Sequence, residues 1–140
     1  APSERAFLKD FESGSATDAE AAAEIGRSFR DAGYLMDPHT ACAVSTWRKL
    51  GGVDRERPCV VLSTASPFKF PASVCRAIGL GAEGDEVATA RALAAAAGLA
   101  LPASLEALPG LALRHRDIVG IEGLETTLRA LVGLSPRTRP

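Results

Sequence analysis

One short run of strand-forming residues constrains the fold of this chain most, because no second run is available to pair with it. Residues 59–62 read C-V-V-L, which is typical of a short strand buried on both faces. Pro67 and Pro71 follow closely and prevent the strand from continuing. A lone buried strand leaves its backbone N–H and C=O groups without partners. We therefore expect a second strand elsewhere in the chain, or a sheet whose other strands lie on another segment.

The strand-like run breaks directly into S-T-A-S at residues 63–66. In open α/β sheets, ligands bind just beyond the carboxyl ends of the strands, so hydroxyl groups there are candidates for holding a small molecule. Serine and threonine are also common in turns and at helix N-caps. On local chemistry alone, the turn and cap interpretation is the more favoured of the two.

The remaining patterns are mostly helical. Thr17 and Glu20 form a capping box, T-x-x-E, which predicts a helix that runs to about residue 32. Asp37 is a good N-cap and Pro38 suits a first helical position, so a second helix is expected from there to G-G at residues 51–52. Further helices are expected over residues 71–78, 85–98, 102–108 and 122–132. The predicted fold class is α/β, predominantly helical with one or two short strands.

Charge and composition argue against several classes of partner. The chain has 16 basic and 17 acidic side chains. This balance argues against nucleic acid or an anionic membrane as a partner, because either would require a concentrated positive field. No apolar run reaches the roughly 18 residues of a membrane span. Neither histidine has a carboxylate pair at metal-ligand spacing, so no metal site is expected. The cysteines, Cys42, Cys59 and Cys75, are predicted to be buried free thiols in a reducing compartment, the cytoplasm.

Two motifs taken together point to a known family. G-Y-L-M-D-P-H-T-A spans residues 33–41, and V-V-L-S-T-A-S-P-F-K-F-P spans residues 60–71. In order and separation they resemble the C-terminal region of bacterial and fungal threonine synthases. L-P-A-S-L-E-A-L-P at residues 101–109, with the leucine-rich helix after it, is similar to that family's C-terminal end. The resemblance covers nearly the whole chain.

The resemblance implies a part of a pyridoxal-phosphate enzyme of fold type II. The family converts O-phosphohomoserine and water to threonine and phosphate, which is a lyase reaction of amino-acid biosynthesis. Residues 1–140 would be a single domain or fragment equivalent to the C-terminal third of the enzyme, within its large α/β domain. By the same resemblance, the Thr64 hydroxyl would form a hydrogen bond with the pyridine nitrogen of pyridoxal phosphate.

The other site residues implied by the resemblance flank Thr64. Asp37, His39 and Thr40 would lie in a loop-to-helix turn near the mouth of the active site, with Ser63 beside Thr64. Lys69 would face the phosphate of the substrate.

Two elements of the family pattern are missing from this chain. The Schiff-base lysine of the family lies in an F-K-D segment before these motifs, and its glycine-rich loop for the cofactor phosphate also precedes them. We therefore expect this chain to bind no pyridoxal phosphate alone, to be inactive alone, and to have the remainder of a threonine synthase chain as its partner. An uncovered sheet edge and uncovered apolar helix faces would favour self-association.

Two alternatives remain open. A free-standing, non-catalytic domain of the same ancestry would bind a small ligand or regulate a partner. A generic helical interaction module would make no use of Thr64 for a cofactor.

Overall fold

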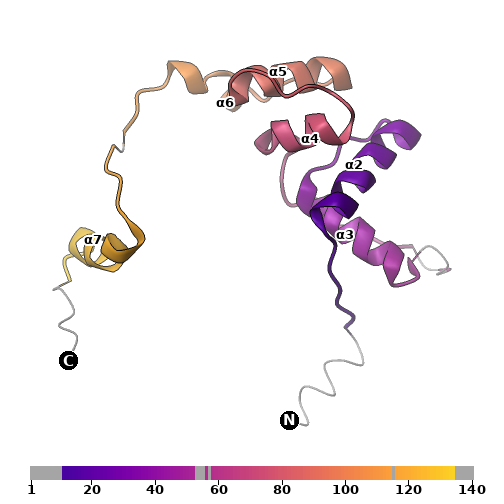
Figure 1. Ribbon diagram of the computed structural model, residues 1–140, viewed down its shortest axis with the longest axis horizontal. Helices are drawn as coiled ribbons and strands as arrows, with labels where there is room; N and C mark the ends of the chain where they lie inside the picture. The colour runs from indigo at the N-terminus through magenta and orange to yellow at the C-terminus, as the bar shows by residue number, and fades with distance from the viewer. Residues whose placement is uncertain (1–10, 53–55, 57, 115, 135–140) are drawn as a thin grey trace, which may run out of the picture. The chain divides into compact units, whose positions relative to one another are not determined.

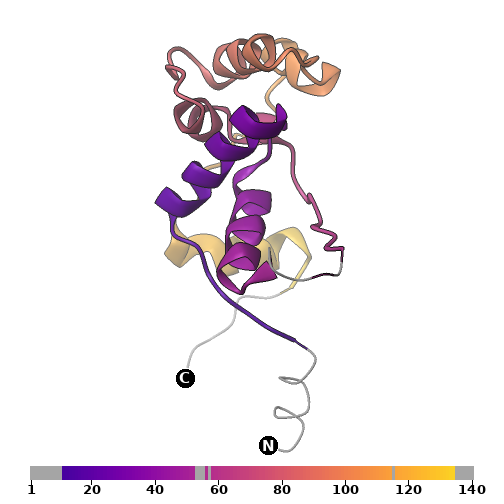
Figure 2. The same cartoon turned by 90° about the vertical axis from the view of Figure 1, so that its right-hand side faces the viewer.

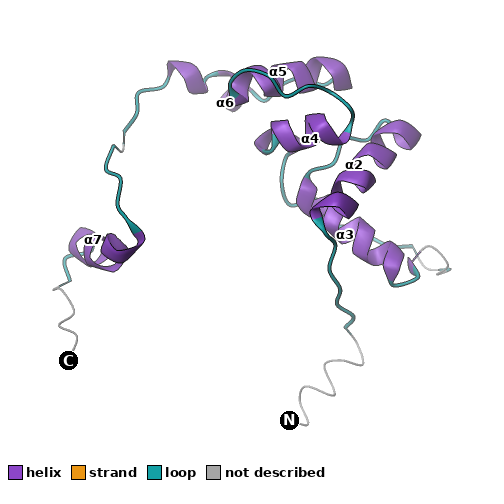
Figure 3. Cartoon of the chain, viewed as in Figure 1, coloured by secondary structure: helices purple, strands orange, loops and turns teal. Residues whose placement is uncertain are grey.

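The computed structural model describes residues 11–52, 56, 58–114 and 116–134, and these form two compact units that divide after Pro109. Every regular element in these ranges is helical (Figures 1 and 3). The α-helices are α2 (Asp18–Ala32), α3 (Pro38–Lys49), α4 (Pro71–Ala77), α5 (Glu86–Ala97), α6 (Ala103–Glu106) and α7 (Leu124–Leu131). Short 3-10 turns are η2 (Pro67–Lys69), η3 (Leu108–Gly110) and η4 (Ile121–Gly123).

The predicted α/β fold class is therefore wrong. Residues 58–66, which contain the strand-like run, form an irregular connection that runs back past α3 towards α4 (Figure 2). Val60 and Leu62 are 85% and 76% exposed rather than buried on both faces. A strand forms only where a neighbouring strand accepts its backbone hydrogen bonds, and none of the described segments is a strand. The apolar pattern alone does not make a strand.

The two helices predicted from caps are confirmed. The Thr17 hydroxyl accepts a hydrogen bond from the Glu20 N–H, and the Glu20 carboxylate accepts one from the Thr17 N–H at 2.7 Å. α2 ends at Gly33, whose φ of 65° lies in the left-handed region that glycine adopts readily. α3 begins at Pro38 behind its N-cap Asp37, as predicted.

α2 and α3 pack together and share an ion pair in which the carboxylate is buried. Glu24 of α2 is buried and accepts a hydrogen bond from Arg48 Nε of α3 at 3.1 Å. Arg27, one turn along α2, lies 3.3 Å from the other Glu24 oxygen. A buried carboxylate needs such partners, because an unpaired charge there costs several kcal/mol.

α4 packs against both α2 and α5, so the core of the first unit lies among these helices. Val74 and Cys75 of α4 and Leu93 of α5 are fully buried. Gly26 allows α2 to approach α4 closely, since a Cβ at this position would lie 2.6 Å from the Ala77 carbonyl oxygen. The buried apolar residues of this core are Ala21, Ile25, Leu35, Met36, Ala41, Phe68, Val74, Cys75, Ala90, Leu93 and Ala94.

The predicted burial of the cysteines holds for one residue of three. Cys75 is buried, and burial raises the pKa of its thiol. Cys42 is half-buried, and Cys59 is exposed because the run that carries it has no sheet to pack into. All three are free thiols, as predicted.

The second unit contains η4 and α7. α7 confirms most of the helix predicted over residues 122–132. Leu124 and Leu128 lie one turn apart on α7 and are about half exposed. No helix in the described part of the chain has the length and apolar character needed to cross a membrane.

Candidate functional site

A buried carboxylate at the start of α3 organises the candidate site. Asp37 has no exposed surface, and its Oδ1 accepts hydrogen bonds from the backbone N–H groups of His39 at 2.9 Å and Thr40 at 3.3 Å. The Thr40 hydroxyl donates a short hydrogen bond to Oδ2. Burial alone would raise the pKa of Asp37, but these hydrogen bonds, the Thr40 hydroxyl first among them, outweigh it and lower the pKa below 3.8. Asp37 is therefore a fixed anion.

Thr40 extends this network to the connection before η2. The Thr40 and Ser63 hydroxyl oxygens lie 3.3 Å apart. A threonine hydroxyl carries one hydrogen, and that of Thr40 is directed at Asp37, so Ser63 supplies the hydrogen for this second contact. The chain of groups from Asp37 through Thr40 to Ser63 ties the connection to the first turn of α3.

His39 lies at the solvent side of the same turn. Its Nδ1 is 3.2 Å from Asp37 Oδ1, and its ring centroid is 5.1 Å from that of Phe70, with the two planes tilted by 56°. This is a normal aromatic contact. The imidazole is therefore held between a carboxylate and an aromatic ring while it stays largely exposed.

Two residues of the S-T-A-S segment, Ser66 and Thr64, have different environments. Ser66 caps η2, since its hydroxyl accepts a hydrogen bond from the Phe68 N–H at 3.3 Å. The turn and cap interpretation is confirmed for this residue. Thr64 is exposed, and its hydroxyl makes no hydrogen bond to the described part of the chain. It follows directly after Ser63, which is held against α3, so its hydroxyl is available to a ligand.

Lys69 lies apart from this network. It is exposed on η2 and lines a separate cavity of about 390 Å³ between η2, α5 and α6. Glu86 and the apolar side chains of Val87 and Leu105 line the same cavity. The structure thus brings Asp37, His39, Thr40 and Ser63 together, and it does not bring Lys69 into hydrogen-bond contact with them.

Phe70 joins the two regions and was not predicted from the sequence. Its ring contacts His39, and the residue also lines the cavity beside Lys69. An aromatic residue between Lys69 and Pro71 gives no local sign that its partner is a histidine on another helix. Among the described residues, no three histidine, cysteine or acidic side chains cluster as metal ligands.

Comparisons with known proteins point to the same family as the sequence resemblance. Residues 40–119 match the protein family described as threonine synthase, C-terminal. The chain is also similar to the threonine synthase of Pseudomonas aeruginosa, with 38% identity over 73 residues. That similarity covers 52% of this chain and 15% of the relative, so the chain matches a small part of a larger protein. The family match includes Thr40, Ser63, Thr64 and Lys69 but begins just after Asp37 and His39.

Proposed function

This chain belongs to the threonine synthase C-terminal family, and on that premise we propose that it is part of a pyridoxal-phosphate-dependent threonine synthase. The complete enzyme would convert O-phosphohomoserine and water to threonine and phosphate in the cytoplasm. The observation that carries the proposal is the family match, which covers the hydroxyl segment and α3 from Thr40 onwards. Residues 1–140 would act as a single C-terminal part of that lyase.

Thr64 is the residue we assign to the cofactor. Its hydroxyl is exposed, has no partner in the described chain, and follows a residue fixed to α3. A hydroxyl forms a hydrogen bond with a pyridine nitrogen without protonating it, so the donor chemistry fits the ring of pyridoxal phosphate. The bound cofactor supplies an electron sink, which an unprotonated nitrogen moderates. Thr64 would thereby orient the ring and set the strength of that sink.

The cluster around Asp37 would orient the site rather than react. The Asp37 carboxylate holds the first turn of α3, and Thr40 passes that restraint to Ser63. His39 would lie near the substrate, because its ring stays exposed while Asp37 and Phe70 limit its movement. Lys69 would attract the substrate phosphate, since its ammonium group is exposed on the same 60–71 segment as Thr64.

The remainder of a threonine synthase would be the obligatory partner. This sequence contains neither an F-K-D segment nor a glycine-rich loop before the D-P-H-T-A motif. We therefore propose that the chain alone does not hold pyridoxal phosphate covalently and is inactive. A lysine-dependent visible absorption band after mixing the chain with the cofactor would contradict this part of the proposal.

The experiment that tests the function uses the longer protein. The coding frame upstream of Ala1 is read, and the protein it encodes is purified with pyridoxal phosphate and supplied with O-phosphohomoserine. We expect release of phosphate and formation of threonine in equal amounts. A start site directly before Ala1, or a longer protein that releases no phosphate, would favour the non-catalytic domain instead.

A further inference from the structure

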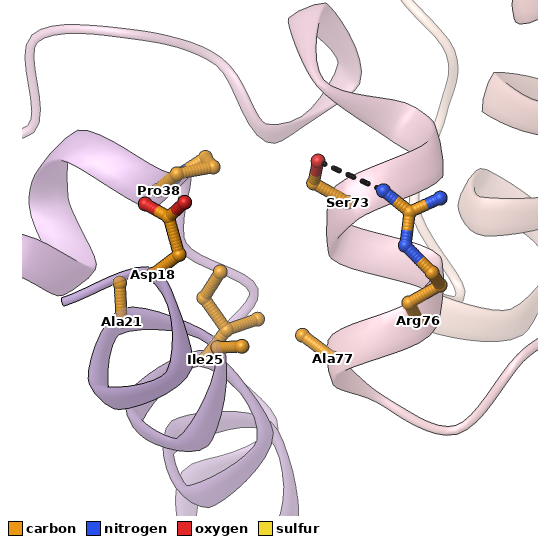
Figure 4. A pocket seen from close by; sticks show the side chains of 8 residues that line it. Asp18, Ala21, Ile25, Pro38, Ser73, Arg76 and Ala77 are labelled. Carbon is orange, nitrogen blue, oxygen red and sulfur yellow. Dashed lines mark hydrogen bonds between the residues drawn. The ribbon is translucent and has the colours of Figure 1, made fainter.

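A second cavity lies between α2, α4 and the start of α3, and Pro38 is its nearest lining residue in sequence to Asp37, which does not itself line it (Figure 4). Its volume is about 340 Å³, at the lower end of the range of about 300–1,000 Å³ for ligand pockets. A cavity of this size suits a small molecule. It is lined by Asp18, Ala21, Ala22, Ile25, Pro38, Ser73, Arg76 and Ala77.

The inner part of this cavity is apolar. Ile25 of α2 and Ala77 of α4 point towards one another across it (Figure 4). Ile25 and Ala21 are buried, and Ala77 is half-buried, so this part of the lining belongs to the packed core. A ligand that reaches it would need a small apolar group.

The outer walls of the cavity carry opposite charges. Asp18 on α2 and Arg76 on α4 lie on opposite sides (Figure 4). The Arg76 Nη2 atom is 3.4 Å from Ser73 Oγ, so a cation and a hydroxyl share one wall. Neither Asp18 nor Arg76 forms an ion pair with the described residues. Both charged groups are therefore free to bind a ligand.

We propose that this cavity binds a small aliphatic α-amino acid. The guanidinium of Arg76 matches a carboxylate, which it can bind through two parallel N–H···O hydrogen bonds, with the Ser73 hydroxyl beside it. The Asp18 carboxylate matches the α-ammonium group on the opposite wall. The aliphatic side chain would lie against Ile25 and Ala77 at the base of the cavity. The site uses neither Thr64 nor a cofactor, so it stands independently of the proposed enzymatic function.

Valine is a suitable probe, and the whole 140-residue chain is titrated with it while methyl resonances are followed by NMR. Saturable shifts are expected for the methyl groups of Ile25 and Ala77. Arg76→Gln and Asp18→Asn should each weaken valine binding by about tenfold, since each removes a charge-assisted contact. Isovalerate, which is valine without its ammonium group, and isobutylamine, which is valine without its carboxylate, should bind about tenfold more weakly than valine.

Matched control variants lie on α2 outside the cavity. Arg30→Gln and Asp31→Asn remove the same kinds of charge from exposed positions near the end of that helix and should leave valine binding unchanged. The proposal is overturned if valine causes no saturable shift in Ile25 or Ala77. It is equally overturned if Arg76→Gln and Asp18→Asn bind valine as tightly as the unsubstituted chain, or if isovalerate binds as tightly as valine.

Discussion

The hydroxyl oxygens of Thr40 and Ser63 lie 3.3 Å apart across 23 residues of sequence. Thr40 is buried and also donates to Asp37, whereas Ser63 is exposed and directly precedes Thr64. This contact connects the only buried aspartate of the described residues to the segment on which the proposed cofactor contact lies. The restraint on Thr64 therefore originates in the first turn of α3.

Replacing the Thr40 hydroxyl with a methyl group tests that restraint. Thr40→Val keeps the shape of the side chain but removes the hydrogen bond to buried Asp37 and the contact with Ser63. The free energy of unfolding should fall by about 1–3 kcal/mol, because a buried charged acceptor loses a donor. Chemical denaturation measures this change. Thr40→Ser retains the hydroxyl and should keep most of the unfolding free energy that Thr40→Val loses. Equal losses of unfolding free energy in the two variants would show that packing rather than hydrogen bonding is responsible.

The lowered pKa of Asp37 predicts a dependence of stability on pH. A carboxylate with a pKa below 3.8 in the folded chain binds its proton more readily when the chain unfolds. The contribution of Asp37 to the free energy of unfolding is therefore complete above pH 3.8. It is lost as the pH falls below that value and passes through the lower pKa of the folded state. Asp37→Asn should reduce stability at neutral pH and make the loss below pH 3.8 shallower. Denaturation curves at several acidic pH values measure both effects, and identical acid profiles for the two proteins would contradict the assignment.

Gly26 is predicted to be required for the packing of α2 on α4. Gly26→Ala would raise the intrinsic helix propensity of α2, yet its Cβ would lie 2.6 Å from the Ala77 carbonyl oxygen. The helices must move apart, and we expect a net loss of about 1–3 kcal/mol in unfolding free energy. Gly81→Ala is the control, because a Cβ there meets no atom within 4 Å. Thermal unfolding measures the stability of both variants. A Gly26→Ala chain as stable as the Gly81→Ala control would contradict the requirement for Gly26 in the packing of α2 on α4.

The exposed leucines of α7 lead us to expect self-association of the isolated chain. Leu128 is 52% exposed, and Leu124 lies on the same side one turn earlier. Sizing at several concentrations should show a mass that rises with concentration, and Leu128→Glu should lower it at a given concentration. Thr126→Glu adds the same charge at another exposed position of α7 and serves as the control. A constant monomer mass would contradict this expectation.

The helices were predictable because their signals are local. Thr17 with Glu20, and Asp37 with Pro38, fix the starts of α2 and α3 through groups no more than three residues apart. The strand over residues 59–62 was predicted wrongly because a strand depends on a partner strand at any distance along the chain, and an apolar run carries no information about that partner.

The candidate site was predictable only in part for the same reason. The motif placed Asp37, His39 and Thr40 in one helical turn, and their spacing alone makes them neighbours. The contact between Thr40 and Ser63, and that between His39 and Phe70, join residues on different elements. Neither partner carries a periodic or capping signal that points to the other, so these contacts required the tertiary structure.

The central claim is that Thr64 contacts pyridoxal phosphate in a longer parent enzyme, and the absorption spectrum of the bound cofactor tests it most directly. Thr64→Ala removes the hydroxyl and should shift the cofactor spectrum and lower turnover by about tenfold or more, since one hydrogen bond to the reacting system is lost. Thr64→Ser keeps the hydroxyl and should preserve both properties. Thr126→Ala, an exposed threonine of α7, is the matched control. If Thr64→Ala shows the spectrum and turnover of the unsubstituted enzyme, the claim is wrong.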